Sequence, residues 1–190
     1  MALNFGGAGG GLFPASATAG YGFDAETGQQ IIADSGEFGL WTTIGVNVLK
    51  AASQTISINV PRGFRMFWVL CVGKLTAGTQ GSMIHLNADE GNTYVSQVVT
   101  SIAPNVTSVQ VLTSGIDACE VDDSFFSSFI STLFDMGALS DVAYQGQGGY
   151  YPKSVYTVGH WGNHTITNIK WKVVAGTFVA GSSMTVYGVR

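Results

Sequence analysis

A short polar stretch in the first half of the chain has the residue types of a calcium loop. Residues 86–94 read LNADEGNTY, with oxygen-bearing side chains at positions 87, 89, 90 and 92 around a glycine. An EF-hand loop needs oxygen ligands at its positions 1, 3 and 5, glycine at position 6 and a bidentate glutamate at position 12. A loop that started at Asn87 would place Gly91 at position 5 and Val98 at position 12, so the pattern fails. The residues favour a turn between two strands, with another kind of oxygen cage as the open alternative.

Other side chains with chemical potential are present, but their spacing supports no site. His160 and His164 flank a turn-like stretch, and neither cysteine has the spacing that a zinc site needs. Paired carboxylates can hydrolyse glycosides when their separation is fixed, but nothing in the sequence fixes one here. The carboxylates concerned form a local acidic patch made of Asp117, Glu120, Asp122 and Asp123. We therefore expect no enzyme, no cofactor and no metal.

An aromatic segment in the second half of the chain is the strongest candidate binding site. Residues 144–151 read YQGQGGYY, which predicts a loop rich in glycine and tyrosine. Aromatic faces on a flexible backbone can stack on sugars, while Tyr and Trp are also enriched in protein interfaces. The sequence thus predicts either an aromatic subunit interface or a glycan-binding loop at Tyr144, Tyr150, Tyr151 and Trp161.

The composition indicates one globular domain with a partly covered surface. The chain has 190 residues, of which 46% are hydrophobic and only 11% are charged, against about 25% charged residues in ordinary soluble domains. So few charges fit a surface covered by copies of the chain or by another protein. The net charge is −4 with scattered basic residues, which argues against nucleic acid as a partner. No apolar run approaches the roughly 20 residues that span a bilayer.

The N-terminal residues do not show a basic segment followed by a continuous apolar stretch, so we expect no Sec-type signal peptide. A chain without export folds in a reducing compartment. We therefore expect Cys71 and Cys119 to be reduced thiols in or near the core, with a disulfide between them as the alternative.

From about residue 39 onward, β-strand patterns dominate. The segment at 64–72 (FRMFWVLCV) is an almost continuous apolar run, which predicts a strand buried on both faces. Short strands separated by Gly, Asn and Pro at intervals of about 8–12 residues favour a sandwich or barrel. The predicted strands are 39–49, 54–60, 64–72, 82–87, 94–101, 106–113, 116–121, 156–161, 165–175 and 183–189.

One segment has a helical pattern. Apolar pairs recur at 125/126, 129/130 and 133/134, with Asp122 or Asp123 before them and Gly137 after them. This spacing predicts an amphipathic helix of about three turns over residues 124–136, capped at both ends. A single helix among many strands is compatible with a jelly roll. The predicted fold is therefore all-β, a jelly-roll-like antiparallel sandwich with one short helix.

The first 38 residues differ from the rest. Glycines at 6, 7, 9, 10 and 11 alternate with aromatic and aliphatic residues that follow neither a helical nor a strand period. We predict an extended Gly-rich arm over 1–38 and a sandwich domain over 39–190. The arm would contact a partner through Phe5, Leu12, Phe13, Tyr21 and Phe23, and a partly disordered tail is the alternative.

Three stretches resemble segments of small β-sandwich proteins of tailed-phage virions. They are SMIHLNADEGNTY at 82–94, VGHW at 158–161 and the closing ITNIKWKVVAGTFVAGSSMTVYGVR at 166–190. The resemblance implies a structural component without an enzymatic site, either a capsid decoration (cement) protein or a part of a tail fibre, often a homotrimer. Two positions depart from the pattern: Ala88 stands where glycine is common, and His85 where an arginine or aromatic residue often stands.

The resemblance leads us to expect a decoration protein on the outer capsid surface, made in the host cytoplasm. Its partners would be further copies of itself, as a homotrimer, and the major capsid protein, over which the arm of residues 1–38 would extend. The alternative is a tail-fibre or receptor-binding domain that holds host glycans with residues 144–161.

Overall fold

The computed structural model describes residues 41–102, 105–135, 141–150, 153–162 and 165–190. It also describes the backbone of two short antiparallel strands, β1 (Tyr21–Phe23) and β2 (Gln30–Ile32). Of the predicted arm residues, Phe5, Leu12 and Phe13 lie outside the described part. Tyr21 and Phe23 are described only as backbone positions of β1.

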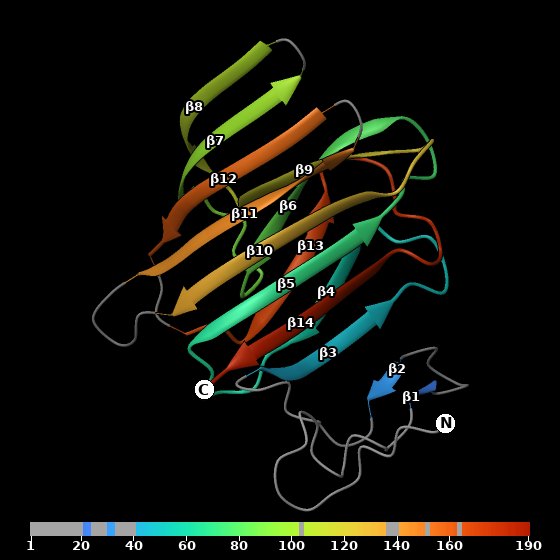
Figure 1. Ribbon diagram of the computed structural model, residues 1–190, viewed down its shortest axis with the longest axis vertical. Coiled ribbons are helices and arrows are strands. Elements are labelled where there is room, and N and C mark those ends of the chain that lie inside the picture. Colours follow the sequence, from blue (N-terminus) through green and yellow to red (C-terminus); the bar gives the residue numbers. More distant parts are fainter. Residues whose placement is uncertain are drawn as a thin grey trace, which may run out of the picture.

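The remaining twelve strands form two antiparallel sheets that face each other, with the larger sheet in front in Figure 1. The larger sheet has the order β3-β14-β5-β10-β11-β12-β7-β8 and the smaller has the order β4-β13-β6-β9. The strands of the larger sheet are β3 (Thr42–Val48), β14 (Ser183–Val189), β5 (Met66–Gly73), β10 (Ser127–Asp135), β11 (Val142–Tyr150), β12 (Lys153–Trp161), β7 (Tyr94–Ile102) and β8 (Asn105–Thr113). Those of the smaller sheet are β4 (Thr55–Asn59), β13 (Asn168–Val173), β6 (Thr79–Leu86) and β9 (Ile116–Asp122).

The prediction of an all-β antiparallel sandwich is confirmed. Each of the ten strands predicted from the alternating pattern overlaps an observed strand, and β7, β9 and β14 agree within one residue at each end. The pairing is mostly non-local, because β14 near the end of the sequence lies between β3 and β5. Side-chain alternation therefore identified the strands, while their order depends on which inward faces fit together.

The core lies between the two sheets and is made of alternate residues of each strand. On β5 the buried side chains are Phe67, Val69 and Cys71, and the residues between them point to the other face. The smaller sheet contributes Trp171, whose ring centroid lies 4.3 Å from that of Phe178. Full burial of a large apolar side chain stabilises the fold by about 1.5–3 kcal/mol, so this layer is the main source of stability.

The helix predicted over 124–136 is wrong, because this segment forms strand β10, and the described residues contain no helix. Phe129 and Leu133 point into the core and are fully buried, while Ile130 and Phe134 point to the opposite face and are partly exposed. The pairs 129/130 and 133/134 thus place one residue on each side of the sheet, while Phe125 and Phe126 precede β10 and are both exposed. Residues four apart lie on one face both of a helix and of a strand. Because apolar residues also occupy the other face of this strand, the sequence shows apolar pairs, which resemble a helical stripe.

The loop predicted at 144–151 is also wrong, since residues 142–150 form β11. Its glycines lie under large rings rather than in a flexible loop. A Cβ added at Gly148 would lie 2.8 Å from the Phe129 ring, and the Tyr144 ring crosses Gly159 of the neighbouring strand β12. The Tyr144 hydroxyl bonds to Ser96 Oγ at 2.5 Å and donates to the Val95 carbonyl at 3.0 Å, both on the next strand, β7.

Cys71 and Cys119 are both free thiols and both buried. Burial raises the pKa of Cys119 to about 12 and raises the pKa of Cys71 well above its ordinary value. At neutral pH both therefore remain protonated and behave as small apolar core residues.

A substitution at Gly159 tests the packing of the Tyr144 ring over the backbone of β12. A Cβ at this position would overlap the Val95 carbonyl oxygen and lie 2.6 Å from the Tyr144 hydroxyl oxygen. We expect Gly159→Ala to lower the free energy of unfolding by about 3 kcal/mol, as overpacking against a rigid backbone does, measured by urea denaturation. Gly162→Ala is the matched control, because the nearest atom to its Cβ would be Asp141 Oδ1 at 3.9 Å. Equal stability of the two variants would contradict the packing.

Candidate functional site

The polar stretch at 86–94 is a tight turn that follows β6. Asn87 and Ala88 have φ values of 54° and 57°, and the Asp89 N–H donates to the Leu86 carbonyl at 3.0 Å. Two successive left-handed residues closed by this hydrogen bond define a type I′ turn. Asparagine tolerates such a conformation, whereas alanine does so at a cost.

Asp89 is the centre of the hydrogen bonds that follow this turn. Its Oδ2 accepts from the Thr93 hydroxyl at 2.6 Å and from Trp161 Nε1 at 2.8 Å, and its Oδ1 accepts from the Gly91 N–H at 2.9 Å. These three donors lower the pKa of the Asp89 carboxyl, the Thr93 hydroxyl most strongly. The carboxylate that could have been a calcium ligand is therefore occupied by the protein's own donors.

Asn87 and Tyr94 of the same stretch are also engaged internally. Asn87 Oδ1 accepts from the Thr167 N–H at 2.7 Å and from the Asn168 N–H at 3.2 Å, which fixes the turn to the start of β13. Tyr94 is buried and stacks on Trp161 at a centroid distance of 5.8 Å. The turn thus joins β6, β7, β12 and β13.

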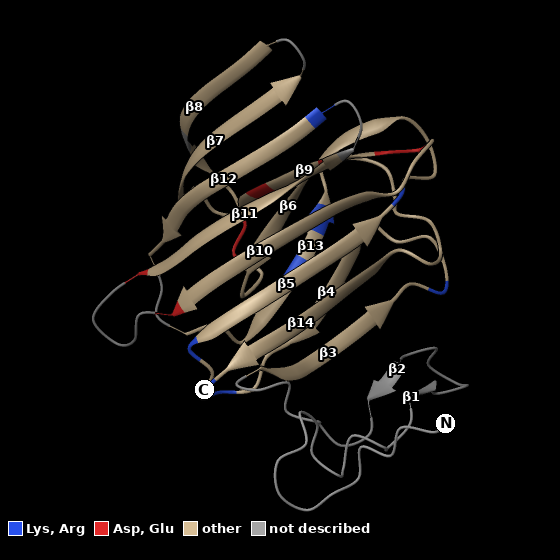
Figure 2. Cartoon of the chain, in the orientation of Figure 1, with Lys and Arg blue, Asp and Glu red and all other residues tan. Residues whose placement is uncertain are grey.

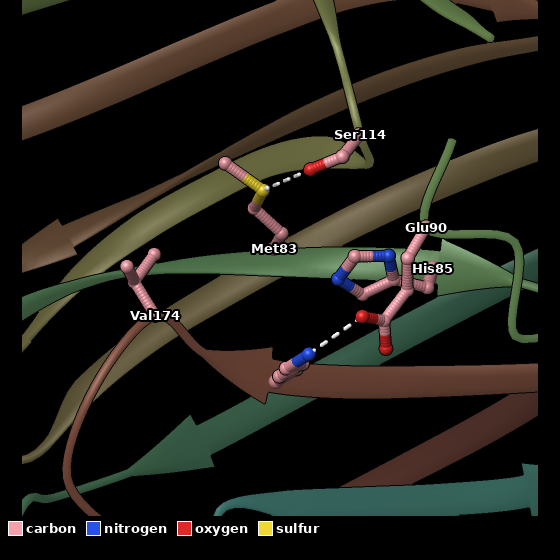
Figure 3. Close-up of a pocket in the computed structure, with 6 residues that line it drawn as sticks. Met83, His85, Glu90, Ser114 and Val174 are labelled. Atoms are coloured by element: carbon pink, nitrogen blue, oxygen red, sulfur yellow. Dashed lines mark hydrogen bonds and ion pairs between the residues drawn. The ribbon is translucent and has the colours of Figure 1, made fainter. Parts of the chain in front are cut away.

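Glu90 lies beside this turn at the rim of a pocket of about 210 Å³ (Figure 3). Its two carboxylate oxygens bind Lys170 Nζ and Lys172 Nζ, each at 2.7 Å, and these hydrogen bonds lower the pKa of Glu90 to about 2. His85 lines the same pocket, and its Nδ1 lies 3.1 Å from the Asp89 carbonyl oxygen. Burial lowers the pKa of His85, so the ring is neutral at pH 7 and Nδ1 carries the proton.

The described residues bring no other candidate chemistry together. Among them, no three His, Cys, Asp or Glu side chains are placed to hold a metal ion. His160 Nδ1 lies 2.9 Å from Asp141 Oδ2 at the surface, while His164 lies outside the described ranges. Of the acidic patch, Asp117, Glu120 and Asp122 belong to β9, and Glu120 forms an ion pair with Lys153. Over the same ranges no helix is long and apolar enough to cross a membrane.

The predicted aromatic site is not assembled as a surface. Tyr144 and Trp161 are buried, with 3% and 1% exposure, and both serve the hydrogen bonds described above. Tyr151 and the side chain of Tyr150 lie outside the described part. Tyr156, at 44% exposure, is the aromatic residue of this region that faces outward. The many glycines and tyrosines of this region were the sequence signal for aromatic rings that pack over the backbone of a neighbouring strand. The prediction of a loop missed that signal.

The outer face of the larger sheet has a property that the sequence pattern did not reveal. Across its eight strands, Asp135 and Lys153 are the only Asp, Glu, Lys or Arg residues, and both stand at strand ends. Figure 2 shows this broad face almost entirely without charged residues, in contrast to the smaller sheet behind it. There, Lys170 and Lys172 point outward between the buried residues of β13.

Large apolar side chains lie on this uncharged face. The rings of Trp41, Trp68 and Tyr187 form a row, with successive centroid distances of 6.0 and 6.2 Å, and Trp68 is 44% exposed. The prediction that 64–72 is buried on both faces is therefore wrong for the described chain: only the inward face of β5 is covered. Solvated faces of antiparallel sheets normally carry polar residues at the outward positions, and this uncharged aromatic face departs from that pattern.

By its fold, the protein belongs to the structural class of antiparallel β-sandwiches, and the outer face of its larger sheet is broad and almost uncharged. No family model matches the chain, and no curated protein matches it. One solved structure found in comparison is the plant- and prokaryote-conserved (PPC) protein of Pyrococcus horikoshii, with 10% sequence identity over 74% of this chain and 81% of that one. Its TM-score of 0.19 is too low to support an argument about fold or function.

The carboxylates of the turn predict acid sensitivity. The folded-state pKa values of Asp89 and Glu90 lie below their ordinary values. The contribution of the two carboxylates to the free energy of unfolding is therefore fully present above a pH of about 4.5 and is lost as the pH falls toward about 2. We expect the free energy of unfolding to decrease over this window in urea titrations. Asp89→Asn should be less stable than wild type at pH 7, and the difference should shrink at pH 2. A constant difference would contradict the role of the ionised carboxylate.

Ala88 tests the turn geometry. A left-handed alanine costs about 1–2 kcal/mol, and glycine loses about 0.5–1 kcal/mol through its greater freedom in the unfolded chain. We therefore expect Ala88→Gly to raise the free energy of unfolding by about 0.5–1 kcal/mol, measured by thermal denaturation. Ala143→Gly, in strand β11, should instead destabilise. Loss of stability in Ala88→Gly would exclude the left-handed turn.

Proposed function

We propose that the protein is a structural component of a bacteriophage virion, a capsid decoration protein that binds the lattice of the major capsid protein. The observation that carries this proposal is the broad outer face of the larger sheet, which lacks charge and presents Trp68 and partly exposed aliphatic residues. Such a face suits permanent burial against another protein better than exposure to water.

The mechanism of such a protein is burial of surface rather than chemistry. A specific, stable interface needs more than about 1,000 Å² of total buried area. An eight-stranded sheet face can meet that requirement because neighbouring strands are about 4.8 Å apart and its strands of seven to nine residues are about 23–30 Å long. A protein that spans adjacent capsid subunits in this way adds contact area that resists internal pressure.

The resemblance to tailed-phage virion proteins supports the same proposal. Among the resembling residues, Asp89 accepts a hydrogen bond from Trp161 of β12, and Asn87 accepts one from the Thr167 N–H next to β13. These bonds fix the turn to other strands, which makes the residues a scaffold signature. They hold four strands together. The resemblance therefore supports a shared framework, and the uncharged face supplies the argument for assembly.

The receptor-binding alternative now rests on different residues. Because Tyr144 and Trp161 are buried, they cannot stack on a glycan without unfolding the sheet. A shallow pocket of about 440 Å³ on the outer face, lined by Gln147, Ser154 and Tyr156 among others, offers another place for a sugar ring. Tyr156→Ala should abolish binding to host cells if this alternative holds, and it should leave capsid binding within a few-fold of wild type if it does not.

The test of the proposal is binding to purified capsids that lack the protein. Trp68→Glu would bury an unpaired charge, which costs about 2 kcal/mol or more and corresponds to about thirtyfold weaker binding. Val174→Glu is the matched control, since Val174 is 58% exposed and follows β13 of the other sheet. Capsid binding by a chain that lacks residues 1–38 measures how much the predicted arm contributes to the affinity. Saturation of capsids by Trp68→Glu at the wild-type concentration would overturn the role of this face.

A further inference from the structure

Strand β8 is an edge strand without the protection that the other sheet edges have. Exposed edges invite pairing with another chain, and proteins block them with charges, prolines, bulges or short length. Edge strand β4 has five residues, β9 carries three carboxylates, and β3 contains a bulge opposite Val186 and Tyr187. β8 has nine residues, NVTSVQVLT, with no charge, proline or glycine, and it pairs with β7 without any shift of register.

The side chains of β8 are also unusually exposed for their type. Val106, Val109 and Leu112 have exposures of 66%, 53% and 65%. The hairpin formed by β7 and β8 extends beyond the smaller sheet, at the upper left of Figure 1. Its inward face borders a groove of about 390 Å³ lined by Val98, Val109 and Asp117 among others.

The sequence of β8 is complementary to itself when it runs antiparallel to a second copy. With Val109 opposite Val109 of the copy, Val106 faces Leu112, Ser108 faces Gln110 and Asn105 faces Thr113. Three of the four pairs that flank the central Val109 thus match apolar with apolar or polar with polar, the exception being Thr107 opposite Val111. Matched cross-strand pairs of this kind stabilise a sheet.

This register is favoured over its neighbours. A two-fold axis perpendicular to the sheet places the inward face of one copy next to the inward face of the other. Paired side chains must then point to the same face, so one residue at the centre lies opposite its own copy. Moving that centre by one residue shifts every pairing partner by two residues. Centring on Ser108 would place Val106 opposite Gln110, and centring on Gln110 would place Leu112 opposite Ser108. Either change shortens the overlap from the full nine residues to about seven.

We propose that β8 pairs antiparallel with β8 of a second copy, which joins the two eight-stranded sheets across a two-fold axis at Val109. Nine paired residues form a seam about 30 Å long. The contact uses the same patch on both copies and closes on itself, as isologous contacts do. It therefore gives a dimer in place of the homotrimer that the resemblance to virion proteins implies. The seam lies at the edge of the sheet and does not depend on capsid binding.

The first experiment is a mass measurement by light scattering over a range of concentrations. Wild type should have twice the 19.9 kDa mass of the chain. Val109→Lys places two ammonium groups opposite each other and should reduce the mass to that of one chain. Val174→Lys, at a similarly exposed site away from this edge, should remain dimeric. All three should share one circular dichroism spectrum and melt at similar temperatures, because these positions are exposed.

The second experiment tests the register. Val106→Lys alone and Leu112→Glu alone should each weaken the dimer at least tenfold. The double variant should recover most of that loss, because each introduced lysine then faces an introduced glutamate of the other copy, twice per dimer. A wild-type monomer, a wild-type trimer or a dimeric Val109→Lys variant would overturn the proposal. A double variant weaker than both single variants would overturn the register.

Discussion

The two sheets of this sandwich differ in width, and most features of the molecule follow from that difference. Four strands cover one face of an eight-stranded sheet, so the core is limited to the region where both sheets are present. The β7–β8 hairpin extends past the cover, and the outer face of the larger sheet has no layer over it within the described chain. Apolar residues on a sheet are stabilised only when something covers them, which is why the proposed function gives this face a protein partner.

The same mismatch explains which sequence-based predictions were right. Strands such as β4 and β14 were recognisable because a buried residue alternates with a more exposed one. The prediction failed at β10, where Phe129 and Leu133 face the core while Ile130 and Phe134 face the open side. It failed at β11 because the glycines there suggested a loop. Both strands lie in the middle of the larger sheet, where pattern rules for a single solvated face do not apply.

The candidate site shows a similar division. The turn that follows β6 could be predicted from Asn87, Asp89 and Gly91, since these residue types favour turns, although its second left-handed residue is Ala88. The partners of Asp89 could not, because Trp161 lies 72 residues away in the sequence and reaches the carboxylate only after β6, β7 and β12 have assembled. The uncharged face was visible in the sequence as a low charge content. Its location required the strand order, which no local pattern contains.

The buried hydrogen bonds and the open surfaces have complementary roles. Asp89, Trp161 and Tyr144 use their polar atoms inside the protein, and Glu90 uses both carboxylate oxygens to bind two lysines at the surface of the smaller sheet. Residues that could have formed a metal or glycan site are thus committed to holding strands in place. What remains for recognition is backbone and apolar surface: the edge of β8 and the face around Trp68. Backbone pairing and apolar burial need rigid geometry, and a sheet fixed by internal hydrogen bonds supplies it.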